Sequence, residues 1–422
     1  MNDPLYLGLD FGTSGARATV INGLGEIAAQ AHCNYDITNW QSWLHALNWL
    51  CASLPRSIRQ RLAAIAIDAT SSTVLLCDAS NIPLLPPLLY NDARAATTFA
   101  QMIHYVPAGH IASNATSSLA KLHFLLQQAE SKRAHYFSDQ ASWLAAMLSA
   151  KPGFSDYHNA LKLGYDVATL AWPAWISRLK ISPWLPEVVP PGTILGKVAP
   201  EVTTKLDIPR ECIVRAGTTD SIAAFIASGA HAPGMAVSSL GSTLVLKLLS
   251  TTRVEDACYG IYSHRFGAMW LAGGASNSGG AILRKYFNDT ALLTLSQQFD
   301  PTQNSGLDYY PLLNRGERFP IYDPLLAPRL SPRPSNDAQF LHGLLEGIAR
   351  IEARGYELLV ELGATPVREI LTAGGGAKNS AWSRMRERLA GVRVSTATHS
   401  EAAYGAACLA KNGADLLLLQ HD

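Results

Sequence analysis

The chain has 422 residues, of which 48% are hydrophobic and 16% charged, a balance typical of a globular protein with a large core. This length favours two domains over one. The formal net charge is only +1, which leaves no basic surplus for nucleic acid. No apolar run reaches the ~18 residues of a membrane span. We therefore expect neither a nucleic-acid nor a membrane partner.

The six cysteines and twelve histidines are scattered along the chain. They form no Cys-x-x-Cys, His-x-x-x-His or His-Glu-x-x-His pattern, so a disulfide framework or a zinc site is not indicated. Asp3 and Asp10 interrupt the region where a signal peptide would need an apolar run. We expect a cytoplasmic protein, or one of the plastid stroma if a transit peptide has been removed.

Strands and helices alternate in the first half of the chain. Three short strands are predicted at 5–9, 18–21 and 27–32, connected by a Gly-Thr-Ser-Gly turn and by an Asn-Gly turn whose residues tolerate positive φ. Apolar runs predict further strands at 63–67, 74–77 and 212–215. Apolar periodicity predicts helices at 93–104, 118–129, 137–149 and 220–228.

The pattern begins again after residues 229–234. Strands at 235–239 and 244–249 flank a Gly-Ser-Thr turn, as the first two strands flank Gly-Thr-Ser-Gly. The predicted elements that follow are strands at 261–263, 268–271, 369–372 and 392–395 and helices at 337–362, 378–390 and 401–411. We interpret this as a degenerate duplication: two α/β domains, 1–228 and 229–422, around a central cleft.

Asp10 is an unusual residue for the end of an apolar strand. The turn after it, Gly12-Thr13-Ser14-Gly15, lets amide hydrogens and hydroxyls approach an anion closely. Together with the second turn, Gly241-Ser242-Thr243, it could hold a polyphosphate from both sides, with Asp10 holding a hydrated Mg²⁺. The alternative is two tight hairpins in which Asp10 caps its own turn, and the turns alone leave both interpretations open.

A glycine-rich passage connects a predicted strand to a helix near the C-terminus. Gly374–Gly376 offer free amides and bare backbone to an anion and to a flat ring. Asn379 could hydrogen-bond that ring, and Trp382 could lie against its other face. The alternative is a glycine-rich turn with Trp382 in the core. The chain has no G-x-x-x-x-G-K-[ST] loop, no G-x-G-x-x-G after a strand and no G-x-S-x-G elbow.

Taken together, these stretches resemble the FGGY carbohydrate kinases of the sugar kinase, Hsp70 and actin superfamily. The resemblance extends over nearly the whole chain, in order and spacing. The matching stretches are DFGTSGAR (10–17), YNDAR (90–94), SSLAKLHFLL (117–126), SDYHNAL (155–161), AGTTDSIAAF (216–225), SLGST (239–243), GASNSGGAILR (274–284), RGERFPIYDP (315–324), LLEGIAR (344–350), GGGAKNSAW (374–382) and EAAYGAA (401–407).

The resemblance implies two duplicated ribonuclease H-like domains and ATP-dependent phosphorylation of a sugar or polyol. Asp220 matches the general base, for which the alternative is a helix N-cap. Asp10 matches the position that holds Mg²⁺ through water and faces the substrate. The implied nucleotide-binding residues are Gly12, Thr13, Ser14, Gly241, Ser242, Thr243, Gly374, Gly375, Gly376, Asn379 and Trp382.

The expected sugar is a pentulose. Xylulose kinases of this family have Gly-Gln-Met-His-Gly where this chain has residues 69–73, so Ser71 and Ser72 replace the Met-His pair. In this the chain resembles a cyanobacterial and plant subgroup of D-ribulose kinases. We expect D-ribulose as substrate with Ser71 as the sugar contact; the alternatives are D-xylulose or another ketose or polyol. For Ser72, a purely structural place in the turn is an equal alternative.

Two other classes of function stay open. One is a non-catalytic sugar- or nucleotide-binding regulator, against which the intact Asp10 and Asp220 argue. The other is a chaperone or filament protein of the same superfamily, for which the chain offers no peptide-binding domain. We expect a monomer or homodimer whose ligands are a small sugar and ATP.

Overall fold

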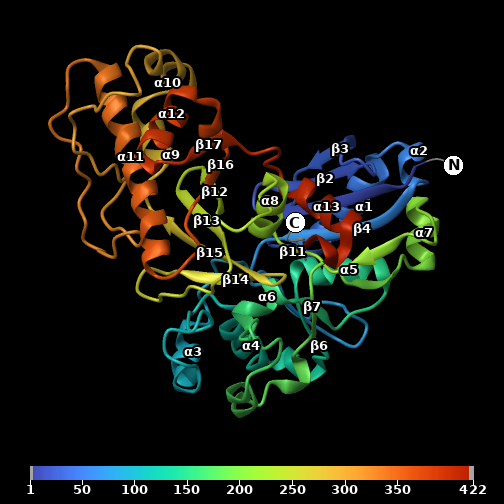
Figure 1. Ribbon diagram of the computed structural model, residues 1–422. Coiled ribbons are helices and arrows are strands. Elements are labelled where there is room, and N and C mark those ends of the chain that lie inside the picture. Colours follow the sequence, from blue (N-terminus) through green and yellow to red (C-terminus); the bar gives the residue numbers. More distant parts are fainter. Residues whose placement is uncertain (1–2, 418–422) are drawn as a thin grey trace. The chain divides into compact units, whose positions relative to one another are not determined.

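The computed structural model describes residues 3–417, which divide into two units (Figure 1). Unit 1 contains residues 3–227 and 401–417, and unit 2 contains residues 228–400. Each unit has its own mixed β-sheet and its own apolar core. None of the helices in the described residues is long and apolar enough to cross a membrane.

The main sheet of unit 1 has the strand order β3-β2-β1-β4-β10-β9, with β11 also paired to β4. Its strands are β1 (Leu5–Gly12), β2 (Gly15–Ile21), β3 (Ile27–Cys33), β4 (Leu62–Ala69), β9 (Ile194–Lys197), β10 (Ile213–Arg215) and β11 (Thr218–Thr219). β1, β2 and β3 pair antiparallel, whereas β1 and β4 pair parallel. β1 and β4 are buried along nearly their whole length, which explains why both are almost continuously apolar.

The sheet of unit 2 repeats this arrangement. Its strands are β12 (Met235–Leu240), β13 (Leu244–Ser250), β14 (Tyr262–Phe266), β15 (Met269–Ser276), β16 (Glu369–Ala373) and β17 (Arg393–Thr396), in the order β14-β15-β13-β12-β16-β17. The pairing of β15, β13, β12 and β16 is antiparallel, antiparallel and parallel, as it is for β3, β2, β1 and β4. The common topology confirms the α/β duplication predicted from the two similar hairpins.

Helices and two small sheets complete the units. The helices of unit 1 are α1 (Trp40–Ser53), α2 (Arg56–Arg59), α3 (Ala96–Met102), α4 (Ser118–Leu126), α5 (Gln140–Ser149), α6 (Tyr157–Ala160), α7 (Pro200–Leu206), α8 (Asp220–Ser228) and α13 (Ala402–Asn412). Its two small sheets pair β5 (Val74–Cys77) with β6 (Tyr136–Asp139) and β7 (Phe154–Asp156) with β8 (Glu187–Val189). The helices of unit 2 are α9 (Gly280–Tyr286), α10 (Asp289–Ser296), α11 (Asp337–Glu361) and α12 (Ser380–Ala390).

The structure corrects the sequence prediction in two places. The helix predicted from residue 137 begins only at Gln140, because β6 pairs with β5 and Asp139 then caps α5. The segment from residue 401, expected in the second domain, packs in unit 1, where the red α13 lies beside the blue strands in Figure 1. A Cβ on Gly8 of β1 would lie 2.0 Å from the carbonyl oxygen of Ala403, so the glycine permits this close packing.

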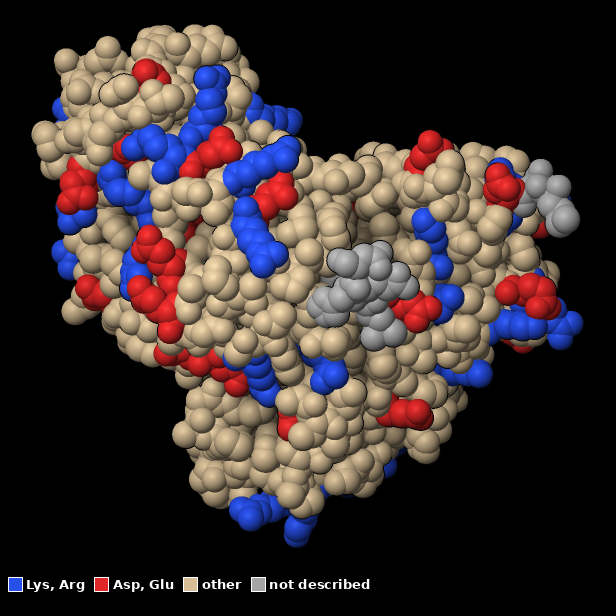
Figure 2. Space-filling view, viewed as in Figure 1, with Lys and Arg blue, Asp and Glu red and all other residues tan. Residues whose placement is uncertain are grey.

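Charged side chains are dispersed over the face seen in Figure 2. Acidic and basic groups alternate there instead of gathering into one field of a single sign. This distribution accords with the net charge of +1.

Candidate active site

Three aspartates meet at one edge of the unit 1 sheet. Asp10 lies near the end of β1, and it is directly opposite Asp68 of β4 in the parallel register. Thr218 of β11 is opposite Asp68, so Asp220 follows at the same edge and begins α8. Because parallel strands end at the same edge of a sheet, the register brings these carboxyl groups together. A Cβ on Gly217 would lie 1.7 Å from the carbonyl oxygen of Ile67, so this glycine allows the close approach.

Asp10 and Asp220 were both predicted as site residues, and their surroundings differ. Asp10 is 5% exposed, and its Oδ2 lies 3.5 Å from Nη1 of Arg17. Burial, together with the charges of Asp220 and Glu401, raises the pKa of Asp10 to about 6 against the opposing effects of Asp68 and Arg17. Asp220 is half-buried, and its Oδ1 accepts a hydrogen bond of 2.6 Å from the backbone N–H of Ser221.

Asp68 is a member of this cluster that the sequence reasoning missed. It is 0% exposed, and neither of its carboxylate oxygens has a hydrogen-bond partner of normal geometry among the described residues. Burial, with the charges of Asp10 and Asp220, raises the pKa of Asp68 well above its usual range. Its contact with Asp10 becomes a hydrogen bond only when one of the two carboxyl groups carries a proton. The available signal was an aspartate ending an apolar strand, the same signal that drew attention to Asp10.

Asp68→Asn is expected to stabilise the protein at alkaline pH. An unfolded aspartate ionises near pH ~4, so a carboxyl group whose pKa is raised by folding contributes stability below that pH and loses it as the pH rises through the folded-state pKa. Asparagine keeps a donor toward Asp10 and cannot ionise. We expect the Tm at pH 8 to rise by ~2–4 °C, equivalent to about 1 kcal/mol, with a smaller difference at pH 5. A variant less stable than the wild type at both pH values in thermal unfolding would contradict this.

The first predicted phosphate turn connects β1 and β2. The side chains of Thr13 and Ser14 are exposed at its tip. The carbonyl oxygen of Gly12 accepts a 2.8 Å hydrogen bond from the hydroxyl of Tyr35, which fixes the turn from behind. Gly15 has a φ of +143°, and a Cβ there would lie 2.9 Å from the carbonyl oxygen of Cys33, so this position requires glycine. The hydroxyls at the tip are therefore available to an anion on a well-supported turn.

The second predicted turn, in unit 2, connects β12 and β13. Gly241 and Ser242 are exposed and Thr243 is half-buried. The backbone N–H of Gly280, at the start of α9, donates to the carbonyl oxygen of Gly241 at 2.8 Å. A Cβ on Gly280 would lie 2.6 Å from that oxygen, so the turn and the helix can approach only because this residue is glycine.

A cavity of about 320 Å³ in unit 2 brings the glycine-rich passage and the second turn together. It is lined by five of the predicted nucleotide-binding residues and by three charged residues that the prediction missed: Arg284, Lys378 and Asp289, of which Asp289 lies 3.8 Å from Arg284. The five are Gly241, Gly375, Gly376, Asn379 and Trp382. Gly374, Ser242 and Thr243 precede or follow them in the chain and are not part of the lining. Bare glycine backbone beside two cations suits a phosphorylated ligand with a flat ring.

Asn379 and Trp382 each have a structural role in addition to lining the cavity. The Asn379 side chain caps α12 by accepting from the Trp382 N–H at 3.0 Å, and it donates to Ser296 at 2.8 Å. The Trp382 indole is 3% exposed and donates to the carbonyl oxygen of Leu345 at 3.1 Å. Trp382 therefore combines the two alternatives considered for it, since it belongs to the core and also faces the cavity.

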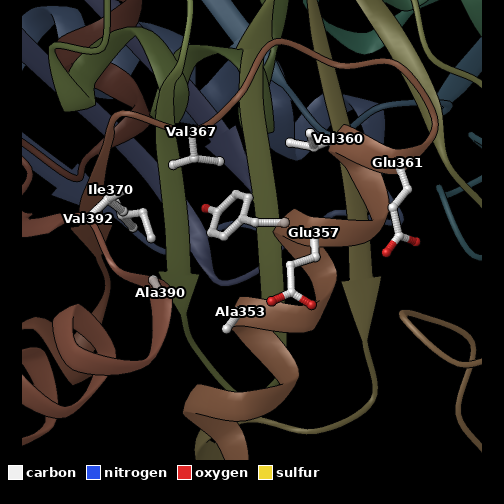
Figure 3. Close-up of a pocket in the computed structure, with 9 residues that line it drawn as sticks. Ala353, Glu357, Val360, Glu361, Val367, Ile370, Ala390 and Val392 are labelled. Atoms are coloured by element: carbon white, nitrogen blue, oxygen red, sulfur yellow. The ribbon is translucent and has the colours of Figure 1, made fainter.

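A second cavity of unit 2, of about 350 Å³, has different chemistry (Figure 3). Apolar side chains of α11 and β16, with residues near β17, form most of its lining, and Glu357 and Glu361 on α11 supply carboxylates. Glu361 is already paired with Arg354. Two carboxylates without a cation in the lining disfavour a phosphate, and none of the predicted site residues lies here. The cavity beside Trp382 is therefore the better candidate for a nucleotide.

The serines expected near the sugar follow β4. Ser71 is half-buried, whereas Ser72 is 1% exposed and has a φ of +61°, in the left-handed region. The Ser72 hydroxyl has no hydrogen-bond partner among residues 3–417. Of the two hydroxyls, that of Ser71 is thus the more accessible to a ligand.

The repeated sheet, its two glycine–hydroxyl hairpins and the aspartate cluster are those expected of two-domain sugar kinases of the actin and Hsp70 superfamily. Models of the N-terminal and C-terminal domains of the FGGY family of carbohydrate kinases match residues 5–227 and 236–413. The chain belongs to the FGGY family of carbohydrate kinases. It is therefore an ATP-dependent carbohydrate kinase, as the resemblance implied.

Similar proteins include several sugar kinases. Xylulose kinase of Streptomyces rubiginosus is 25% identical, with 96% of this chain and 87% of that protein covered, and gluconokinase of Bacillus subtilis is 21% identical, with 90% and 81% covered. A xylulose kinase from Brucella ovis has a crystal structure similar at a TM-score of 0.84 and 21% identity, covering 98% of this chain and 92% of that one. Plasmodium falciparum glycerol kinase with ADP reaches 0.81 at 16% identity, covering 100% and 91%. These structural similarities support the fold.

Proposed function

We propose that this kinase transfers the γ-phosphoryl group of ATP to a terminal hydroxyl of a pentulose, D-ribulose in preference to D-xylulose, with Asp220 as general base. The observation that carries the proposal is the position of Asp220 at the sheet edge beside Asp10 and Asp68. Asp220 removes the proton of the attacking hydroxyl as the phosphoryl group is transferred in line. Its half-buried carboxylate is accessible to such a hydroxyl.

Asp10 fits a role in holding a hydrated Mg²⁺. Its Oδ1 is buried and has no hydrogen-bond partner of normal geometry among the described residues, so this oxygen could accept from a metal-bound water. The metal, when bound, neutralises charge on the phosphates. The turns at Gly12, Thr13 and Ser14 and at Gly241, Ser242 and Thr243 donate to phosphate oxygens, and Gly374–Gly376, Asn379 and Trp382 bind the adenosine moiety.

D-xylulose is the second candidate substrate. The support for it is the relationship to proteins named as xylulose kinases, at about a quarter identity over almost the whole chain. Against it stands the replacement of the Met-His pair by two small hydroxyl side chains. The pentuloses differ in the orientation of one hydroxyl, so the polar groups near that hydroxyl decide between them.

Ser71→Ala is expected to reduce kcat/KM for D-ribulose by ~10-fold, because a buried hydroxyl of the sugar loses its partner. The matched control is Ser72→Ala, which removes a hydroxyl from the neighbouring buried position and leaves kcat/KM within about two-fold of the wild type. The measurement is coupled ADP release with D-ribulose, D-xylulose, glycerol and gluconate. A wild-type preference for any of the other three substrates would overturn the ribulose assignment. If none of the four substrates is phosphorylated, the proposed function is wrong.

A further inference from the structure

Lys121 of α4 is a buried cation whose partners are all backbone carbonyls. Its side chain is 0% exposed. The Nζ atom donates to the carbonyl oxygens of Ser72 at 2.7 Å, Leu89 at 2.6 Å and Tyr90 at 3.3 Å. Within the described chain it makes no ion pair. All three donors of the ammonium group are therefore used, and they bind two segments that are far apart in sequence.

Burying an ammonium group in this way costs folding free energy unless each of its N–H groups has an acceptor. Burying an ammonium group without a counter-ion loses its hydration, and only the three carbonyl oxygens replace that water. The Ser72 carbonyl belongs to a residue whose left-handed φ of +61° is disfavoured for a side chain with a Cβ, at a cost of ~1–2 kcal/mol. Lys121 thus supports a strained turn, and that turn carries Ser71.

We propose that Lys121 is a positioning residue for the sugar: its ammonium group holds the Ser71–Ser72 turn against Leu89–Tyr90, and loss of its proton loosens the sugar contact. This inference rests on the proposed function, in which Ser71 contacts a pentulose. Lys121 does not touch the substrate; it fixes the backbone from which the Ser71 hydroxyl extends. A preorganised hydroxyl costs the sugar less on binding than a mobile one.

The charge of Lys121 is sensitive to pH near neutrality. Burial lowers the pKa of Lys121 to about 7, the carboxylate of Asp92 opposes this, and the positive charge of Lys162 adds to it. Asp92 is itself bound by Arg94. A neutral amine has two N–H donors and a lone pair, so one carbonyl loses its donor and faces a repulsive lone pair. The sugar affinity is therefore expected to fall as the pH rises through about 7.

The test compares Lys121→Met with Lys162→Met. Methionine keeps the length of the apolar stem and removes the donors, whereas Lys162→Met removes a nearby charge that forms no hydrogen bond with the Ser71–Ser72 turn among the described residues. We expect Lys121→Met to raise the KM for the sugar ~10–10²-fold at pH 6.5, with the KM for ATP within about two-fold of the wild type. The sugar KM of the wild type rises between pH 6 and 8.5, and this rise is absent from Lys121→Met.

The second variant keeps the inference testable if Lys121→Met does not fold. Removing the charge of Lys162 raises the pKa of Lys121, so the increase in sugar KM should move to higher pH with kcat unchanged. An unchanged sugar KM in folded Lys121→Met, or a wild-type sugar KM independent of pH, would overturn the inference alone. Absence of any sugar-dependent turnover in the wild type would instead refute the proposed function, and the inference with it.

Discussion

Asp220→Asn is expected to lower kcat for sugar phosphorylation by ~10²–10⁴-fold, the usual contribution of a general base. Asparagine has the shape of aspartate and can still accept from the N–H of Ser221, so the start of α8 is preserved. What is lost is the group that takes the proton of the attacking hydroxyl. Since the charge of Asp220 also raises the pKa of Asp10 and Asp68, both carboxyl groups should ionise at lower pH in the variant.

The matched control is Asp337→Asn. Asp337 is likewise an aspartate in the first turn of a helix, α11, but it is exposed and pairs with Arg333, which precedes that helix. This control should turn over at the wild-type rate. For Asp220→Asn, the ATP affinity should match that of the wild type, and the Tm should not fall below it because one charge of the aspartate cluster is removed. Near-normal turnover in Asp220→Asn would falsify its assignment as the base and leave the helix-capping alternative.

Asp10→Ala is expected to lower kcat by ~10²–10³-fold, the usual cost of removing one electrostatic group from a phosphoryl-transfer site. The apparent Mg²⁺ concentration for half-maximal activity should increase, because alanine offers the hydrated metal no acceptor. Sugar affinity, measured by calorimetry without nucleotide, should change far less. Arg17 retains Glu401 as a neighbour at 3.4 Å, so its charge is not left alone. An active variant with an unchanged Mg²⁺ requirement would reduce Asp10 to a structural residue.

The same carboxyl group predicts an acidic limit of activity. With a pKa of about 6 in the metal-free protein, Asp10 is protonated at lower pH and no longer binds a hydrated cation well. Activity at limiting Mg²⁺ should therefore fall as the pH falls below about 6, and excess Mg²⁺ should restore part of it by competing with the proton. A profile at limiting Mg²⁺ that excess metal does not shift would contradict this assignment.

The local features of the site were predictable because they depend on residues close together in the chain. A hairpin with glycine and hydroxyl residues at its tip has its geometry set by a few dihedral angles, so both turns were predicted correctly as turns between strands. The duplication followed from the recurrence of that local pattern. Asp10 was recognisable because a carboxylate at the end of an apolar strand needs a reason to be there, whereas Asp220 was identified by its match to the general base of the family.

Other features depend on contacts between distant residues, which local patterns do not encode. Asp68 joins the site only through the β1–β4 register. The role of Lys121 depends on the folded chain, which brings the carbonyl oxygens of Ser72 and Leu89 within hydrogen-bond distance of its ammonium group. The close packing of α13 on β1 is possible only because Gly8 has no side chain. Local patterns were therefore enough to predict the turns, the repeated α/β pattern and the kinase family. Which carboxylates share one environment depended on the folded sheet, because burial and mutual repulsion arise only when the strands are paired.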